Sequence, residues 1–283
     1  METYDPHTHT GFLRHLALRY SHNAQHKMEV MVNFVTSPCE IKERLVPLAN
    51  EIRQKFSACV CVLQSMTDSK ANVACSNKGQ RLLAGERMFI EHELGGLSFK
   101  ISPDSFFQTN SFQLPLLYEQ VLRLSNIRSA DHVLDLFCGT GTIGLYLSKS
   151  CASVTGIEVV PSAIKDAQEN AKRNGIENAN FVLGDLEKLK KDPAVLPPGE
   201  NVDVIIVDPP RGGLHRDLVK YLVQTSARRI VYVSCNPATQ ARDILALQEQ
   251  HHGKFFVEAI QPIDMFPHTP HIESVIAIQV NAV

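Results

Sequence analysis

The sequence lacks any run of about 18 apolar residues, the length that a membrane-spanning helix needs. Apolar residues make up 44% and charged residues 20% of the 283 positions, which is typical of a soluble globular protein of one large or two modest domains. The N-terminus, "METYDPHTHTGFLRH", lacks the basic stretch followed by an apolar stretch that marks a secretion signal. We therefore expect a cytoplasmic protein; an organellar or nuclear location is also compatible with these features.

The sequence also lacks an excess of either charge, since 28 basic residues face 30 acidic ones and the net charge is −2. A protein that binds nucleic acid without specificity would be visibly basic. The balance argues against that class, but it leaves open an enzyme that grips one structured RNA through a local patch. Seven cysteines, an odd number without regular spacing, do not indicate a disulfide scaffold. We expect most of them to be buried as small apolar groups and one to be chemically active.

The chain shows no internal repeat, and its hydrophobic pattern changes near residue 95. Residues 1–95 predict a small α+β domain, with strands in "FLRHLALRYS", "KMEVMVNFVT" and "ACVCVLQSM" and a helix between the last two. Within residues 96–283, strands alternate with helices from Asp131 onward. This alternation predicts an α/β, Rossmann-like fold with a doubly wound, mostly parallel sheet. The expected strands are "HVLDLF", "SVTGIE", "NANFVLGD", "VDVIIVD", "RIVYVS" and "ESVIAIQV".

A glycine-rich loop, "VLDLFCGTGTIGLYLS", follows the first of these strands and has G-x-G-x-x-G spacing. Glycines there let a ligand approach the N-terminus of the next helix, and a NAD site is the competing interpretation. Asp135 lies ahead of the glycines, where a carboxylate would repel a pyrophosphate but suits a cationic aminoacyl group. Glu158 ends the next strand and is placed to accept hydrogen bonds from two ribose hydroxyls. Together they favour S-adenosylmethionine (SAM), a sulfonium nucleoside without phosphate.

Glu158 and a third carboxylate, Asp185, also have simpler interpretations. Glu158 could be a solvated carboxylate at a strand end. Asp185 follows the third strand and either faces the adenine end of the cofactor or caps a helix.

The strand "VDVIIVD" stops at Asp208, in "DPPR", and ligands bind at the carboxyl ends of parallel strands. Asp208 is therefore expected at the same edge as Glu158. Enzymes that methylate exocyclic base nitrogens have an aromatic residue where this chain has Arg211, which argues against that reaction.

Cys235 ends the strand in "RIVYVSCNP" and should lie at the same edge of the sheet. It is either a packed thiol at a turn or a nucleophile. A thiolate that adds to C6 of uracil makes C5 nucleophilic enough to accept a methyl group. Arg211 is a candidate positive neighbour that lowers the pKa of this thiol. A base must then remove the C5 proton, and the segment "DMFPHTPHIESVIAIQV" offers His268, His271 and Glu273.

Five segments, in this order, resemble those of the RNA uracil-C5 methyltransferases, which make 5-methyluridine in transfer or ribosomal RNA. They are "ISPDSFFQTN", "LDLFCGTGTIGL", "DPPRGGLH", "YVSCNPAT" and "DMFPHTPHIESV", and the resemblance covers roughly residues 100–280. It implies a SAM-dependent methyltransferase domain with RNA as substrate and Cys235 as the nucleophile. Of the candidate bases it favours Glu273. The positions that the resemblance assigns to SAM binding are Gln108, Phe137, Thr142, Glu158 and Asp208.

The chain departs from this family in its N-terminal part. Family members often begin with a small β-barrel that binds RNA, and nothing here resembles one. Two interpretations are open: such a module has been removed from this sequence, or residues 1–95 are the domain that faces the RNA. Some members hold an iron–sulfur cluster, but Cys59 and Cys61 with Cys39 and Cys75 lack its spacing, and we expect no metal. Two other functions fit less well: methylation of another base or a small molecule, and an RNA-binding or RNA-folding module without chemistry.

Overall fold

The protein, described by a computed structural model for residues 2–38, 42–70, 76–186 and 202–281, contains two compact units. They comprise Met1–Ser105 and Phe106–Val283. The expected boundary at residue 95 falls inside a hairpin, β5 (Ile90–Leu94) and β6 (Leu97–Ile101). This hairpin belongs to the first unit because β5 contacts two strands of that unit, β1 (Leu13–His22) and β2 (Met28–Thr36).

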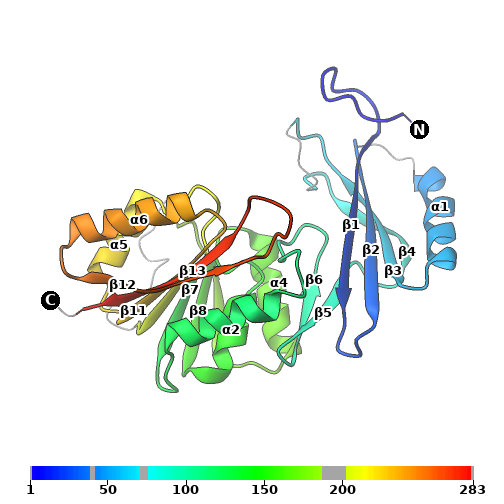
Figure 1. Cartoon of the computed structure of the whole chain (residues 1–283). Coiled ribbons are helices and arrows are strands. Elements are labelled where there is room, and N and C mark those ends of the chain that lie inside the picture. The colour runs from blue at the N-terminus through cyan, green and yellow to red at the C-terminus, as the bar shows by residue number, and fades with distance from the viewer. Residues whose placement is uncertain (1, 39–41, 71–75, 187–201, 282–283) are drawn as a thin grey trace. The chain divides into compact units, whose positions relative to one another are not determined.

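Besides this hairpin, the first unit contains a four-stranded sheet with helix α1 on it (Figure 1). Its strands follow the order β1-β2-β3-β4, and only β2 and β3 are parallel, because helix α1 connects them. Apolar residues of α1, such as Leu45 and Ala49, pack on Val32 and Val62 of the sheet. The elements are β1 (Leu13–His22), β2 (Met28–Thr36), α1 (Lys42–Lys55), β3 (Cys59–Met66) and β4 (Gln80–Gly85).

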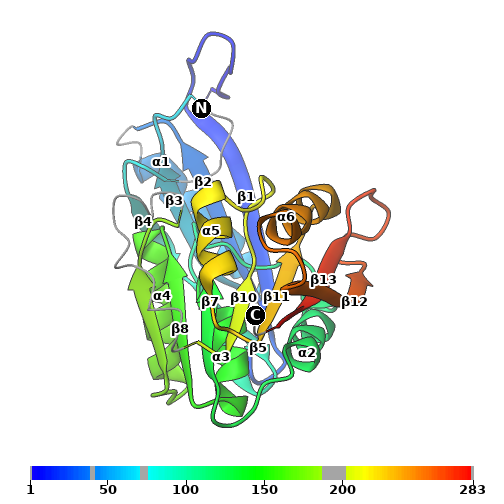
Figure 2. The same ribbon diagram turned by 90° about the vertical axis from the view of Figure 1, so that its left-hand side faces the viewer.

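The second unit contains a seven-stranded sheet in the order β12-β13-β11-β10-β7-β8-β9, which Figure 2 shows side by side from β8 to β12. Strands β7 to β11 are parallel, and β13 runs antiparallel to both of its neighbours. The strands are β7 (His132–Leu136), β8 (Ser153–Glu158), β9 (Ala179–Leu183), β10 (Val204–Val207), β11 (Arg229–Ser234), β12 (Phe255–Ile263) and β13 (Glu273–Val280).

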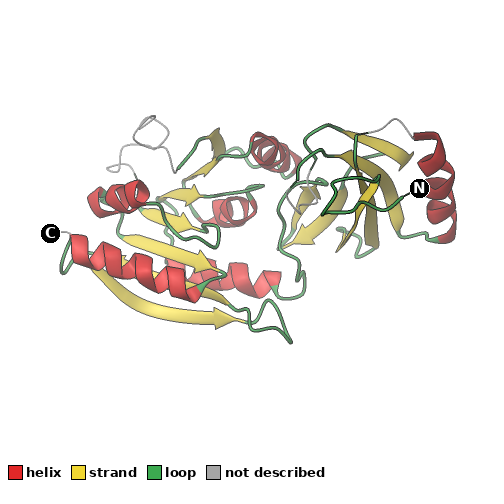
Figure 3. Ribbon diagram, turned by 90° about the horizontal axis from the view of Figure 1, so that it is seen from above, coloured by secondary structure: helices red, strands yellow, loops and turns green. Residues whose placement is uncertain are grey.

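Helices cover both faces of this sheet, as the red and yellow elements of Figure 3 show. On one face, α5 (Arg216–Gln224) and α6 (Pro237–Gln250) bury Leu218 and Leu247 against strand residues such as Leu134 and Tyr232. On the other lie α2 (Leu114–Ser125), α3 (Thr142–Leu147) and α4 (Pro161–Arg173). The predicted α/β fold with a mostly parallel sheet is confirmed. Among the residues described, no helix combines the length and apolar character needed to cross a membrane.

The sequence pattern of "MFIEHELGGLSFK" is typical of the hairpin that β5 and β6 form, whereas β4 and β12 were not predicted from the sequence. β12 lies at the edge of the seven-stranded sheet, where Phe256 and Ile260 are exposed. Its residues do not alternate regularly between buried and exposed. Backbone pairing with β13, rather than burial of one face, holds this strand in place. A hydrophobic pattern alone therefore does not identify it.

Candidate active site

The glycine loop begins where β7 ends, and its backbone is held in unusual conformations. Phe137, the first residue after the strand, has a φ of 64°, a left-handed conformation that costs a bulky residue on the order of 1–3 kcal/mol. Gly144, in the first turn of α3, lies against the strand, and a β-carbon there would come within 2.9 Å of Asp135 Oδ2. Only glycine lets the helix begin so close to β7.

Asp135 is completely buried beneath this loop. Its Oδ2 accepts a hydrogen bond of 2.9 Å from the Gly144 backbone N–H, whereas its Oδ1 has no hydrogen-bond partner. Burial, together with the negative charge of Glu158, raises the pKa of this carboxyl to about 7, and the Gly144 bond opposes the rise. A buried carboxylate with a free acceptor atom suits a positively charged ligand group.

Replacing Asp135 by asparagine is expected to change how stability depends on pH. Because the folded pKa of about 7 exceeds the ordinary value of 3.8, the folded protein retains a proton that the unfolded chain releases between these values. Wild-type stability therefore falls as the pH rises through this window, by on the order of 4 kcal/mol. The variant lacks this contribution. Chemical denaturation without ligand at about pH 4 and about pH 8 measures the difference, and equal pH dependence would contradict the prediction.

Glu158, at the end of β8, is held by three backbone N–H groups. Its Oε1 accepts bonds from Val159 and Val160 at 2.8 and 2.9 Å, and its Oε2 accepts one from Gly139 at 3.1 Å. The carboxylate is thus tied to the glycine loop rather than free in solvent, and Oε2 keeps an acceptor site open. Asp185 follows β9, the strand that pairs with β8. Any helix that Asp185 could cap falls outside the described residues.

A cavity of about 670 Å³ opens at the carboxyl ends of the parallel strands. This volume is within the usual range for small-molecule sites. Four carboxylates and one cationic side chain, that of Arg211, are among the lining residues, so the cavity favours a positively charged ligand over a pyrophosphate. It brings together seven of the eight site residues predicted from the sequence: Gln108, Phe137, Glu158, Asp185, Asp208, Cys235 and Glu273.

The eighth predicted residue, Thr142, lines a smaller cavity of about 30 Å³ instead. This cavity shares Gln108, Phe137 and Asp208 with the larger one. The Thr142 hydroxyl is 2.6 Å from the Tyr118 hydroxyl of α2, which donates a hydrogen bond to it. The structure therefore places Thr142 directly beside the main cavity.

Cys235 and Glu273 meet because of the register between β11 and β13. Ser234, the last residue of β11, pairs with Ser274 of the antiparallel β13. If this antiparallel pairing is continued by one residue, Cys235 lies opposite Glu273 at the carboxyl end of β11. The sheet therefore brings a half-buried thiol and a buried carboxyl to one side of the cavity.

Burial and the neighbouring charges together set the pKa values of Cys235 and Glu273. Burial raises the pKa of the Cys235 thiol, as do the charges of Glu273 and Asp208, while a hydrogen bond from Arg211 and its positive charge lower it. Burial raises the pKa of Glu273 to about 7, and Arg211 opposes this rise. Burial and the charges of Glu273 and Asp135 also raise the pKa of Asp208. The expected positive neighbour is present, but the effect of burial on the pKa of the thiol is larger than that of Arg211.

The other described cysteines differ from Cys235 in burial. Of five free cysteines in the described ranges, Cys59, Cys61, Cys138 and Cys151 are buried. Burial raises the pKa of the Cys61 thiol to about 12, which makes it unreactive. The remaining two, Cys39 and Cys75, lie outside the described residues. Within the described part of the chain, no group of three or more His, Cys, Asp or Glu side chains could hold a metal ion, and the absence of a metal site stays a prediction.

Aromatic residues line the cavity, whereas the two histidines predicted as alternative bases do not. Phe106, which is 69% exposed, and Phe266 line the cavity. Phe266 was not singled out from the sequence, although it lies within the segment that supplies Glu273. His268 and His271, the alternative bases, are exposed and are not among the cavity-lining residues. The geometry therefore favours Glu273 over either histidine.

The strand order, the glycine loop and the acidic cavity define the second unit as a Rossmann-like methyltransferase domain. Residues 127–254 match the family model described as a methyltransferase domain. The chain is 40% identical over 277 residues to an uncharacterized RNA methyltransferase of Oceanobacillus iheyensis, covering 97% of this chain and 58% of that protein. A relative with the same description from Chlorobaculum tepidum is 39% identical over 281 residues, 97% of this chain and 55% of the relative. The chain is therefore similar along nearly its whole length to proteins described as RNA methyltransferases, which confirms the resemblance at this level.

Solved structures show the same relationship. The tRNA (uracil-54, C5)-methyltransferase of Pyrococcus abyssi, in complex with S-adenosyl-L-homocysteine, has a TM-score of 0.77 and 33% identity. The match covers 98% of this chain and 62% of that one. Trm5b of the same organism has a TM-score of 0.61 at 18% identity, covers 89% of this chain and 73% of that one, and supports the fold alone. The chain spans less than two thirds of the length of the curated relatives and of the uracil methyltransferase.

Proposed function

We propose that this chain transfers a methyl group from SAM to C5 of a uridine in transfer or ribosomal RNA. One observation carries the proposal: Cys235 and Glu273 line the same cavity as the glycine loop, Glu158 and Asp208. A site for transfer to another atom or molecule would not need a thiol beside a base. The structural similarity to a protein described as a tRNA uracil-C5 methyltransferase supports the same substrate.

The acidic part of the cavity suits SAM, which when bound supplies a methyl group on a sulfonium. Glu158 would hold the ribose hydroxyls, and Asp185 would face the adenine. Asp208, Gln108 and the loop residues Phe137 and Thr142 would complete the binding site. Asp135, with its buried unpartnered oxygen, lies under the loop where a cationic group would neutralise it.

The chemistry proceeds through a covalent bond between protein and base. The Cys235 thiolate attacks C6 of uracil, and the electron pair of the C5–C6 double bond passes into the enolate, so that C5 becomes the nucleophile for the methyl group. Glu273 then removes the proton from C5, the C5–C6 double bond re-forms, and the bond between sulfur and C6 breaks. A carboxylate whose pKa is about 7 is well suited to accept a proton at neutral pH.

The target base must leave its stack to reach Cys235, at a cost of a few kcal/mol. Phe106, exposed at the cavity, is placed to contact an extruded nucleotide. We also propose that the first unit faces the RNA. The relatives are described as RNA methyltransferases, which supports this role. A variant protein without this unit should bind RNA more weakly than the whole chain, and equal binding would contradict the role.

Incubation with RNA that contains 5-fluorouridine tests the covalent mechanism. Fluorine at C5 cannot be removed as a proton would be, so the bond between Cys235 and C6 is expected to persist after methyl transfer. With SAM present, a protein–RNA adduct should survive denaturing electrophoresis. RNA with ordinary uridine is the control. A folded protein that binds SAM and RNA yet forms no adduct would contradict the mechanism.

A further inference from the structure

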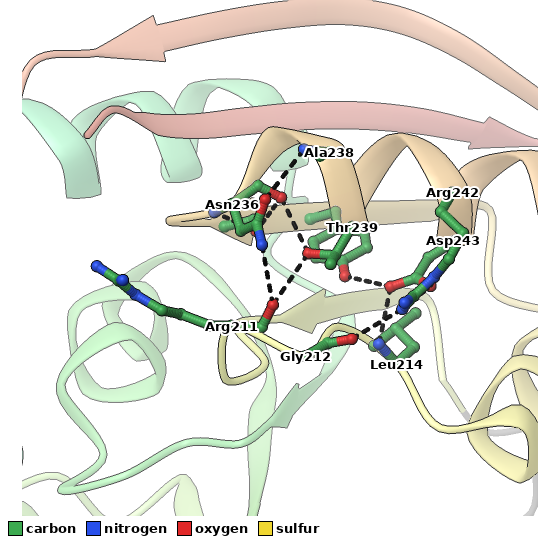
Figure 4. Close-up of polar contacts among 10 residues, drawn as sticks. Arg211, Gly212, Leu214, Asn236, Ala238, Thr239, Arg242 and Asp243 are labelled. Atoms are coloured by element: carbon green, nitrogen blue, oxygen red, sulfur yellow. Dashed lines mark hydrogen bonds and ion pairs between the residues drawn. The ribbon is translucent and has the colours of Figure 1, made fainter. Parts of the chain in front are cut away.

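The turn that carries Arg211, residues 209–214, is attached to α6 through its backbone. The Arg211 carbonyl accepts hydrogen bonds of 3.1 Å from Asn236 Nδ2 and 3.2 Å from Thr239 Oγ1 (Figure 4). The Gly212 carbonyl accepts one of 2.8 Å from Arg242 Nη2. Three residues at the beginning and middle of one helix thus fix two consecutive peptide groups of this turn.

Asp243 is the centre of this attachment. Its carboxylate is buried, and Oδ2 accepts hydrogen bonds from the Leu214 N–H at 2.7 Å and from the Tyr232 hydroxyl at 2.8 Å. Its Oδ1 accepts bonds of 2.9 and 2.7 Å from Nε and Nη2 of Arg242. Such charge-assisted bonds are roughly twice as strong as neutral ones, and shielding from water makes them stronger still.

The turn approaches α6 so closely that it leaves no room for a side chain. Gly213 has a φ of 80°, and a β-carbon there would overlap Asp243 Oδ2 and lie 2.6 Å from Arg242 Nη2. The turn therefore packs directly against Asp243 and Arg242, and the Asp243 carboxylate is placed to hold its backbone.

The Arg211 side chain points away from this network, as Figure 4 shows, and lines the cavity together with Cys235 and Glu273. Around the thiol, the charged groups are Glu273 at the start of β13, Asp208 at the end of β10, and Arg211. Both carboxylates raise the pKa of the thiol, and Arg211 is the group that opposes them. The guanidinium therefore opposes the effect of the two carboxylates, and moving it away would raise the pKa of the thiol.

We propose that Asp243 is a positioning residue that holds the turn 209–214, so that the Arg211 guanidinium stays beside Cys235 and Glu273. Asp243 does not line the cavity and acts through the backbone of the turn. The inference deepens the proposed function and rests on it for its catalytic meaning. Its structural content, however, concerns the reactivity of one thiol and can be measured without SAM or RNA.

The test is the pH profile of Cys235 alkylation by iodoacetamide, followed by mass spectrometry of the Cys235 peptide. Only the thiolate reacts, so the profile reports the pKa of the thiol. Asp243→Asn should move the midpoint upward by about one pH unit and slow alkylation near neutral pH about 5- to 10-fold. In an Arg211→Ala background, Asp243→Asn should cause no additional shift, because the two residues act in series. Independent, additive shifts would overturn the proposal.

Leu247→Ala provides the matched control, since Leu247 is buried one turn further along α6 and its apolar side chain makes no hydrogen bond to the turn. It should lower stability and leave the Cys235 profile unchanged; an equal shift would mean that general loosening is responsible. If Asp243→Asn does not fold, Arg242→Gln, which removes the donor to Gly212, should shift the profile in the same direction. An unchanged profile would overturn the proposal. If the variants show these shifts but the wild-type protein forms no adduct with 5-fluorouridine RNA, the covalent mechanism alone is contradicted.

Discussion

Cys235→Ala is expected to abolish methyl transfer, with a fall in turnover of about 10³-fold or more. Without the sulfur no bond to C6 forms, and C5 of uracil remains too weak a nucleophile to accept the methyl group. Transfer of a radiolabelled methyl group from SAM to RNA measures the effect, and the adduct with 5-fluorouridine RNA should disappear in parallel.

Cys151→Ala is the matched control for this loss. Cys151 belongs to the same unit and is buried, and its thiol donates only to the carbonyls of Leu147 and Ser153. This variant should methylate RNA like the wild type. If the Cys235→Ala variant kept its activity, the target would be another atom or another molecule, and the thiol would be a packed residue at a turn.

Glu273→Gln is expected to trap the protein on ordinary uridine-containing RNA. The amide preserves the shape of the side chain but accepts no proton, so methyl transfer can occur while release of Cys235 cannot. Turnover should fall about 10²- to 10⁴-fold, and a methylated covalent complex should accumulate, visible by denaturing electrophoresis and mass spectrometry.

The pH dependence of release distinguishes Glu273 from the other candidate bases. Because the pKa of Glu273 is about 7, its active, deprotonated form increases as the pH rises through this value, and the release rate should rise with it. Replacing His268 and His271 together by asparagine should leave both release and its pH profile intact. Release that is lost in the histidine variant and retained in Glu273→Gln would assign the base to a histidine.

Several features of the site could be predicted because they depend on local sequence. The strand–loop–helix alternation indicates a parallel sheet, and all parallel strands present their carboxyl ends at one edge. Glu158, Asp208 and Cys235 each follow or end such a strand, so their common location follows from their positions in the sequence. Phe266 had no comparable signal, since it lies in a connection between two strands that run in opposite directions.

The sequence by itself determined the class of fold, the edge of the sheet that holds the candidate site, and the residues proposed for it, because periodicity and turn residues act over a few positions. The tertiary structure decided that Cys235 is opposite Glu273, since the pairing of β11 with the antiparallel β13 joins segments about 40 residues apart. It also decided that burial brings the pKa of Glu273 to about 7 and that α6 fixes the backbone of Arg211. Desolvation and strand register depend on neighbours distant in the chain, and no local pattern encodes them.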